Sequence, residues 1–313
     1  MDGASPTPQF LGRIRRGEIA GVVLLGDNIG RSGPTGLIAQ LQAAARAGGQ
    51  PPLLIAIDQE GGSVRRLTVP PTLAPREMTS VSVAQSQGVA TGRALRRLGV
   101  TVDLAPVLDV PTSTGSFIAD RSFSFDANAV AARGVAFANG LLQGGVASTA
   151  KHFPGLGRLR QNTDFGAGRV DASRQALERD LLPFRAAVRA GMPAVMVGTA
   201  SYPAYGSSLP AACVPAVVDG LLRRRLGFRG AILTDDLGTP AVSALIPPLQ
   251  AVVRAVHAGV DLVYITSPTG SDDVIGERAY AALLQAARRG QISLPQLNSS
   301  YNRIIALKRA GSG

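Results

Sequence analysis

Tryptophan is absent from this sequence of 313 residues, and aromatic residues make up only 4% of it. Proteins that bind single-stranded nucleic acid stack the bases on aromatic side chains, so this class of protein is disfavoured. Cysteine occurs once, at Cys213, and histidine only twice, which excludes an internal disulfide and argues against a zinc site. No apolar run reaches the length of about 18 residues that a membrane helix needs, so no membrane span is expected.

Lysine is nearly absent too. Lys151 and Lys308 are the only two, so arginine supplies most of the formal net charge of +11. The arginines are scattered along the expected helices and do not alternate with aromatic residues, so we expect no nucleic-acid partner. Residues 1–12 also lack the basic stretch and apolar core of a signal peptide, which predicts a cytoplasmic location.

What the sequence does contain is a regular alternation of short apolar runs and helical patterns. The apolar runs are nearly continuous and rich in β-branched residues, as is typical of parallel strands buried on both faces of a sheet. The expected strands are 21–25, 53–57, 101–105, 147–150, 194–197, 231–234 and 261–265. The expected helices are 35–47, 83–98, 127–142, 173–190, 215–226, 244–258, 273–288 and 294–309.

This alternation indicates βα units joined by right-handed crossovers. About seven such units favour a (β/α)8 barrel of the TIM type over an open doubly wound sheet. No GxGxxG motif opens a helix after the first strand, which argues against a dinucleotide-binding fold. The composition does not shift along the chain and no linker is visible. We therefore predict one α/β barrel domain that spans residues 1–313.

Polar residues are concentrated where the expected strands end. Asp58 follows the second apolar run, Asp109 follows the third, Lys151 and His152 follow the fourth, and Asp235 follows the sixth. Because the active sites of barrels lie at the carboxyl ends of the strands, these side chains are predicted to face one pocket. A lysine and a histidine that can bond hydroxyl groups suit a pocket for a sugar.

Simpler structural interpretations exist for several of these residues. Asp236 is compatible with a cap on the following helix, although adjacent residues at a strand end point to different sides, so Asp235 can still face the pocket. The segment Asp58–Gly62 is compatible with a tight turn, and Arg65 and Arg66 with solvated charges. The residues alone leave both interpretations open.

Five stretches of the chain resemble motifs of glycoside hydrolase family 3, in the branch of the bacterial β-N-acetylhexosaminidases. They occur in the family's order, and the resemblance covers the chain from Gly21 to its carboxyl end. The stretches are IDQEGGSVRRL (57–67), VDLAPVLDV (102–110), DRSFS (120–124), AKHFPGLG (150–157) and GFRGAILTDDL (227–237). AKHFPG and DQEGG together are highly specific, whereas TDDL alone is a weak signal.

The resemblance implies a barrel that hydrolyses O-glycosidic bonds with retention, through a covalent glycosyl-enzyme intermediate on Asp235. It implies exo-action on terminal β-linked N-acetylglucosamine of cell-wall or chitin-type fragments, so the expected partner is a small carbohydrate. No metal or organic cofactor is implied, because two carboxylates suffice for glycosyl transfer. The family's sugar-binding positions map onto Asp58, Arg66, Arg121, Lys151 and His152.

The chain departs from the family at the general acid/base. This branch uses an Asp–His pair on the loop after the KHFPG motif, where the present chain has Asn162, Thr163 and Asp164. Whether or not the alignment of this loop with the family contains a gap, no histidine stands at the position of the family's histidine. We predict that Asp164 itself is the acid/base, in a retaining pair whose carboxyl groups lie about 5–5.5 Å apart. The alternative is that Asp164 belongs to an Asx turn and the acid is missing.

A second departure concerns the start of the barrel. Family members carry one more strand and a helix before the strand at 21–25, whereas only residues 6–18 precede it here, so the first strand is expected to be absent. An open barrel leaves strand edges unpaired. A start codon set too far downstream, a partner that covers the gap and a genuine truncation are all compatible with this expectation. Thr199 also replaces a histidine of the family.

Three functions compete at this level. A retaining β-N-acetylhexosaminidase is favoured, and a β-glucosidase is a close variant of it. A sugar-binding pseudoenzyme would keep the binding residues but lack a competent acid/base. A phosphorylase or transglycosylase would use the same intermediate with an acceptor that needs little deprotonation, such as phosphate.

Overall fold

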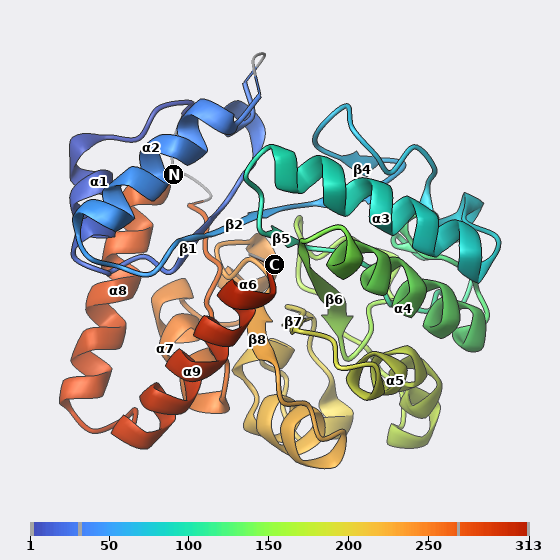
Figure 1. Cartoon of the computed structure of the whole chain (residues 1–313). Helices are drawn as coiled ribbons and strands as arrows, with labels where there is room; N and C mark the ends of the chain where they lie inside the picture. Colours follow the sequence, from blue (N-terminus) through green and yellow to red (C-terminus); the bar gives the residue numbers. More distant parts are fainter. Residues whose placement is uncertain (1–2, 31–32, 268–269, 312–313) are drawn as a thin grey trace.

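The computed structural model describes residues 3–30, 33–267 and 270–311. Its centre is a curled parallel sheet of six strands in the order β1-β2-β5-β6-β7-β8, which lie side by side in Figure 1. These strands are β1 (Gly21–Val23), β2 (Leu54–Ile57), β5 (Val102–Asp103), β6 (Ala147–Phe153), β7 (Ala194–Val197) and β8 (Ala231–Thr234). The predicted α/β fold with a barrel-type parallel sheet that lacks a strand is therefore confirmed.

Helices cover the outside of the sheet (Figure 1). They are α1 (Pro8–Arg15), α2 (Thr35–Ala47), α3 (Val81–Arg97), α4 (Ala127–Gln143), α5 (Arg174–Arg189), α6 (Pro240–Ser243), α7 (Pro248–Ala258), α8 (Asp272–Arg288), α9 (Leu294–Ala310) and a π-helix at Ala216–Arg225. Several begin at an expected cap, because the side chains of Ser80, Asp126 and Ser173 each accept a bond from an amide of the first turn. Within the described ranges, no helix is long and apolar enough to cross a membrane.

The core explains why the strands read as apolar runs. All residues of β2, β6, β7 and β8 are buried. One cluster of apolar side chains fills the interior of the curled sheet, and the largest cluster lies between the sheet and its helices. Because the strands are parallel, their carboxyl ends all meet at one rim of the sheet.

The predicted strand at 261–265 is not formed as a regular strand. It lies beside β8, but only the bridge between Leu233 and Leu262 has ladder geometry. Side-chain oxygens take the place of carbonyls there: Tyr264 N donates to Thr234 Oγ1 (2.9 Å), and Thr266 N donates to Asp236 Oδ1 (2.8 Å). Backbone bonds join the segment to β8 on either side of Leu233, from Leu262 N to Ile232 O (3.1 Å) and from Thr234 N to Leu262 O (3.0 Å), but beyond Leu262 the side-chain bonds replace a continued ladder.

Several elements were not predicted, among them helix α6, a first helix and a short hairpin. Helix α1 precedes β1, with Thr7 as its cap, and packs Phe10 and Ile14 inward. A short antiparallel hairpin, β3 (Gln59–Gly61) with β4 (Val64–Arg65), follows β2 at the rim. Glycine is required at this turn, because Gly61 and Gly62 both have positive φ.

Candidate active site

A cavity of about 700 Å³ opens at the carboxyl ends of the strands. It is lined by the seven residues that were predicted to be catalytic or sugar-binding, which come from five separate segments of the chain. These residues are Asp58, Arg66, Arg121, Lys151, His152, Asp164 and Asp235. The strand-end rule therefore brought together residues that are up to 177 positions apart, from Asp58 to Asp235 (235 − 58).

The floor of the cavity carries a network of opposite charges. Lys151 Nζ lies 2.5 Å from Asp58 Oδ1 and 2.7 Å from Glu60 Oε1. Arg121 holds the other side of Glu60 with two bonds, Nε to Oε2 at 2.9 Å and Nη2 to Oε1 at 2.7 Å. Arg66 stands further out, with Nη2 3.9 Å from Asp58 Oδ2 and 41% of its side chain exposed. Asp58 is thus placed by Lys151 while its carboxylate still borders the cavity.

Glu60 belongs to the segment that follows the second strand, and the sequence analysis assigned it no role of its own. Its side chain is 1% exposed. Burial alone would raise its pKa, but the charges of Lys151 and Arg121 and their bonds outweigh this effect and lower the pKa to about 2. The signal was available in the spacing, because Glu60 lies two residues after Asp58 and so points to the same side of an extended chain.

His152 is held by a buried carboxylate. Its Nδ1 lies 2.8 Å from Asp109 Oδ2, and the same carboxylate accepts bonds from the backbone N–H of His152 at 3.3 Å and of Leu156 at 2.6 Å. Asp109 is fully buried. An imidazole whose Nδ1 is bound in this way presents Nε2 to the cavity in a fixed orientation. The sequence predicted that Asp109 faces the pocket, whereas the structure places it behind His152 and outside the lining of the cavity.

Asp235 stands at the end of β8, half-buried in the wall of the cavity. Its backbone N–H donates to Val197 O (2.8 Å), and its Oδ1 accepts a bond from the N–H of Asp236 (2.8 Å). Burial raises the pKa of the Asp235 carboxyl, the nearby His152 opposes this rise, and the charge of Asp164 adds to it. A carboxylate with one oxygen bound and the other available is suited to nucleophilic attack.

Asp236 has a structural role. Its Oδ1 accepts bonds from the N–H groups of Gly238 and Thr266, both at 2.8 Å, and Thr266 Oγ1 donates to its other oxygen. It therefore fixes the loop after β8 to the segment beyond residue 261. Asp236 is therefore not a cap of the following helix, whose N-cap is Thr239. Both aspartates border the cavity, but the oxygens of Asp236 are taken up by these loop bonds.

Asp164 lies on the loop that follows β6. The Asx turn in this loop is made by Asn162, whose Oδ1 accepts the N–H of Asp164 (3.0 Å) and whose Nδ2 donates to Asp164 Oδ2 (3.1 Å). Thr163 is buried and anchors the loop, while Asp164 is exposed and lines the cavity. The turn therefore presents the Asp164 carboxylate to the cavity, where its negative charge contributes to the raised pKa of Asp235.

Asp103 is a further acid below the charged network, and the sequence did not single it out. It is fully buried at the end of β5, where its Oδ1 accepts the N–H of Gln59 at 3.0 Å. Its Oδ2 has no hydrogen-bond partner among the described residues. Burial, with the nearby charges of Asp58 and Glu60, raises its pKa to about 8 against the opposing effects of the Gln59 bond and Lys151.

The cavity can therefore hold a polyhydroxylated ligand and attack it. Carboxylate, ammonium, guanidinium and imidazole groups offer both acceptors and donors, and two carboxylates, Asp235 and Asp164, lie on different loops of one cavity. In the described part of the chain, no cluster of three or more His, Cys, Asp and Glu residues is arranged to hold a metal ion.

Comparison with known proteins agrees with this geometry. The family described as glycosyl hydrolase family 3 N terminal domain matches residues 10–307. An uncharacterized secreted glycosyl hydrolase of Arthroderma benhamiae is 31% identical over 98% of this chain and 89% of its own length. Beta-hexosaminidase LpqI of Mycobacterium tuberculosis is 32% identical over 94% of this chain and 76% of its own.

The same relationship appears in three dimensions. The solved structure of a glycoside hydrolase family 3 beta-N-acetylglucosaminidase from Paenibacillus sp. str. FPU-7 superimposes with a TM-score of 0.93 and 32% identity. The match covers 99% of this chain and 60% of the Paenibacillus chain.

Proposed function

This chain belongs to glycosyl hydrolase family 3, and we propose that it is a retaining exo-β-glycosidase specific for terminal β-linked N-acetylglucosamine of cell-wall or chitin-type fragments. The observation that carries the proposal is the position of Asp235. Its carboxylate stands in the wall of the same cavity that Lys151, Asp58 and His152 line with donors and acceptors. The sugar specificity rests on the relatives named beta-hexosaminidase and beta-N-acetylglucosaminidase.

The first step of the proposed reaction forms a covalent intermediate. One oxygen of Asp235 attacks the anomeric carbon, the bond from that carbon to the leaving oxygen breaks, and Asp164 gives its proton to the leaving oxygen. In the second step, Asp164 accepts a proton from water, the water oxygen bonds to the anomeric carbon, and the bond to Asp235 breaks. Two displacements at the same carbon give net retention.

The remaining residues hold the sugar. Asp58 accepts bonds from hydroxyl groups, and Lys151 and His152 donate to them, while Arg121 and Arg66 border the same cavity. Lys151 and Arg121 are fixed by Glu60 before the sugar arrives. Donors that are already oriented place the anomeric carbon near Asp235 without a further cost in ordering, which supplies a large part of the rate.

The test is release of 4-nitrophenol from aryl β-glycosides of N-acetylglucosamine, glucose and xylose. Aryl leaving groups need little protonation, so the first step proceeds even with a weak acid. We expect turnover of the N-acetylglucosaminide and its loss in Asp235→Ala. Asp171→Ala is the matched control, because this carboxylate is 66% exposed and lies outside the cavity.

Four other results would be informative. Turnover that survives in Asp235→Ala would overturn the assignment of the nucleophile. Preference for the glucoside would replace the proposed sugar but keep the mechanism. Sugar binding without turnover by folded protein would indicate a pseudoenzyme, and stimulation by phosphate would indicate a phosphorylase.

A further inference from the structure

Six helices end in an exposed arginine on the side of the molecule that is opposite the catalytic cavity. A helix in a barrel runs back antiparallel to the strands, so the last turns of these helices lie at the amino ends of the strands. None of the six side chains makes a hydrogen bond or an ion pair with another described residue. We call this side the basic face, and its arginines are Arg15, Arg46, Arg97, Arg189, Arg288 and Arg309.

Hydrogen bonds join neighbouring helix ends on this side. Gln50 Nε2 donates to Arg15 O and to Gly48 O, both at 3.2 Å, and so connects the end of α1 to the end of α2. Arg96 Nη1 donates to Gly145 O (3.3 Å) and connects the ends of α3 and α4. Arginines that are scattered along the sequence are therefore gathered on one surface of the fold.

Helix α9 lies across the same face. Its inner side is held by Asp261, which begins the segment beside β8, because Ser300 Oγ donates to Asp261 Oδ1 (2.6 Å). Leu307 packs into the apolar interior of the sheet, and the cap of the helix, Gly311, lies against the carbonyl of Thr101 just before β5. Figure 1 shows α9 crossing in front of β8 toward this end.

The loops of the basic face offer no free acid to these arginines. Among the described residues, the loops that lead from a helix into the next strand contain two acids, Glu18 and Asp261. Glu18 is bound by two arginines at the end of α1, at 3.2 and 2.5 Å. Asp261 is fully buried and is bound by Arg223 and Arg303 (2.7 Å). The positive charge of the basic face is therefore not neutralised by these loops.

Helix stability explains only part of this pattern. A cation in the last turn stabilises a helix through the helix dipole, so one arginine at each end is expected for this reason alone. The dipole does not account for the lack of free acids in the loops between the helix ends. It also does not account for exposed apolar side chains on α9. Both features are typical of a surface that binds an anionic partner.

The solvent side of α9 carries an apolar ridge, which consists of Leu294, Leu297 and Tyr301. Spacings of three and four residues place these side chains along one side of the helix, away from Ser300, which faces Asp261. Their exposed fractions are 68%, 37% and 57%. Leucine and tyrosine on an exposed helix, with basic residues beside them, are typical of a helix that lies in the interface of a membrane.

We propose that the basic face binds the surface of an anionic phospholipid membrane, with the apolar ridge of α9 at the level of the lipid headgroups. A guanidinium group binds phosphate through two parallel hydrogen bonds, and each basic residue near an anionic bilayer adds to the affinity. Leu294 and Tyr301 add an apolar contribution that does not depend on charge. The proposal goes beyond the hydrolase activity and does not depend on it.

The arrangement of the charges favours a bilayer over a linear polyanion. The arginines of the basic face come from helices on several sides of the sheet and from α9 across it, so they are spread over a face and do not follow a stripe. A linear polyanion would contact a few of them at a time, whereas a planar surface contacts all of them together. A polyanion also has no apolar layer that could receive the ridge of α9.

Binding through the basic face leaves the catalytic cavity open to water. The cavity lies at the carboxyl ends of the strands. Helix α3, which runs between the two sides, has 17 residues, and a helix of this length spans about 25 Å. The bound protein therefore presents its catalytic cavity away from the membrane, toward sugars in the aqueous phase.

The first test is co-sedimentation of the protein with lipid vesicles. We expect binding to vesicles made of equal parts of phosphatidylglycerol and phosphatidylcholine, and little binding to phosphatidylcholine alone. Binding should weaken in about 1 M salt, where the Debye length is about 3 Å. It should not vanish there, because the contribution of the apolar ridge is not screened. Samples without vesicles show that the protein does not sediment by itself.

Two double variants of equal charge test the face that binds. Arg15→Gln with Arg46→Gln should lower the partition coefficient about twentyfold, since each basic residue contributes about fivefold. Arg65→Gln with Arg160→Gln is the matched control, because it removes two exposed charges at the opposite rim, on the β3–β4 hairpin and on the loop after β6. The control should change the partition coefficient less than about twofold, because the Debye length is about 10 Å at 0.1 M salt. Thermal unfolding shows that both variants fold.

A tryptophan reporter tests the orientation of the bound protein. The chain has no tryptophan, so Tyr301→Trp and Phe165→Trp each introduce a single one. On binding, the emission of Tyr301→Trp should shift to the blue and be quenched by brominated phospholipids. Phe165 is 77% exposed on the loop that carries Asp164, at the opposite rim, so Phe165→Trp should show neither change.

The proposal is overturned if the protein does not bind anionic vesicles, if it binds neutral vesicles equally well, or if the two double variants lose equal affinity. Unchanged emission of Tyr301→Trp on bound protein, together with equally strong binding to polyphosphate, would assign the face to a linear polyanion and would also overturn it. Self-association that Leu294→Ser abolishes, in protein that does not bind vesicles, would assign the ridge to a second copy. These measurements do not involve Asp235, so failure here is distinct from failure of the proposed hydrolase activity.

Discussion

The Nδ1 atom of His152 lies 2.8 Å from the buried Oδ2 of Asp109. This carboxylate also accepts two backbone N–H groups, so it cannot move with the ring. The pair fixes both the orientation of the imidazole and the nitrogen that it offers to a ligand. His152 therefore depends on a residue that does not itself border the cavity.

Asp109→Asn tests this dependence. The amide replaces one acceptor oxygen by a donor, so the bond from His152 or from Leu156 is lost. A lost bond of about 1.5–3 kcal/mol to a charged group lowers kcat/KM about tenfold to a hundredfold. Steady-state kinetics on the aryl N-acetylglucosaminide measure this, and a larger change in KM than in kcat would indicate loss of sugar binding. An unchanged kcat/KM in folded protein would contradict the role of Asp109.

The leaving group reveals the role of Asp164. Asp164→Asn should reduce turnover of disaccharides about 10²-fold to 10⁴-fold, because their alkoxide leaving groups need a proton. The first step with 2,4-dinitrophenyl glycosides should change little, and azide should restore their turnover by displacing Asp235 without general-base help. Asn162→Ala is the control, because it loosens the loop but keeps the acid. Equal losses for good and poor leaving groups would show that another group supplies the proton.

Asp103 predicts an unusual dependence of stability on pH. Its pKa is about 8 in the folded protein and about 3.9 in an unfolded chain, so the folded state binds a proton that the unfolded state releases between these values. This contribution to stability is complete below about pH 4 and is lost as the pH rises through about 8. The contribution of Glu60 to stability does not vary with pH in this range, because its pKa of about 2 keeps it ionised above about pH 4.5.

Asp103→Asn keeps the Oδ1 acceptor for Gln59 and cannot ionise. Relative to the unsubstituted protein, its melting temperature should be similar at about pH 5 and higher by about 2 °C or more at about pH 9. Calorimetry at the two pH values provides the measurement. A lower melting temperature at the alkaline value would show that the Asp103 carboxylate is stabilised in its charged form.

Two arginines that line the same cavity should differ in their effect on stability. Arg121→Leu leaves the buried Glu60 with Lys151 alone and should lower the free energy of unfolding by about 3 kcal/mol. Arg66→Leu removes a guanidinium that is 41% exposed and 3.9 Å from Asp58, so its cost should stay below about 1 kcal/mol. Urea unfolding of both variants gives the comparison. Similar losses in the free energy of unfolding would mean that the two hydrogen bonds from Arg121 do not stabilise Glu60.

Local patterns determined much of this fold. Helix α2 begins and ends at the predicted residues, Thr35 and Ala47, because a Pro precedes it and a Gly follows it. Helix α1 escaped prediction, since eight residues carry too few apolar positions for a clear period. The segment 261–265 has a strand-like sequence, but its bonds to Thr234 and Asp236 depend on side chains of a neighbour that no local pattern reveals.

The residues of the candidate site were likewise predictable where a local pattern marks them and not where distant neighbours decide their role. Strand ends alone indicated Asp58, Lys151 and Asp235, because the carboxyl ends of parallel strands meet at one rim. Asp103 was missed and Glu60 was given no role, because the importance of both comes from burial beside charges of other strands. The sequence alone does not show whether a carboxylate is surrounded by water or buried beside a lysine.

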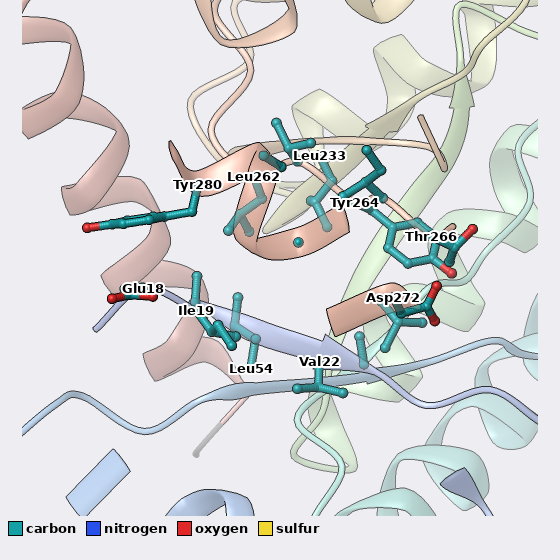
Figure 2. A pocket seen from close by; sticks show the side chains of 18 of the residues that line it. Glu18, Ile19, Val22, Leu54, Leu233, Leu262, Tyr264, Thr266, Asp272 and Tyr280 are labelled. Carbon is teal, nitrogen blue, oxygen red and sulfur yellow. The ribbon is translucent and has the colours of Figure 1, made fainter. Parts of the chain in front are cut away.

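Tyr264 and Thr266 line both the catalytic cavity and a second, mostly apolar cavity of about 350 Å³ between β1 and the segment 261–266 (Figure 2). Substitutions in the two cavities are therefore not independent perturbations, even when the altered side chains are far apart in the sequence. Neighbours that share partners typically show coupling energies of about 0.5–3 kcal/mol in double-mutant cycles. Directed evolution of this protein for a new sugar would thus select changes in the apolar cavity as well as at the rim, and the order in which they accumulate would matter.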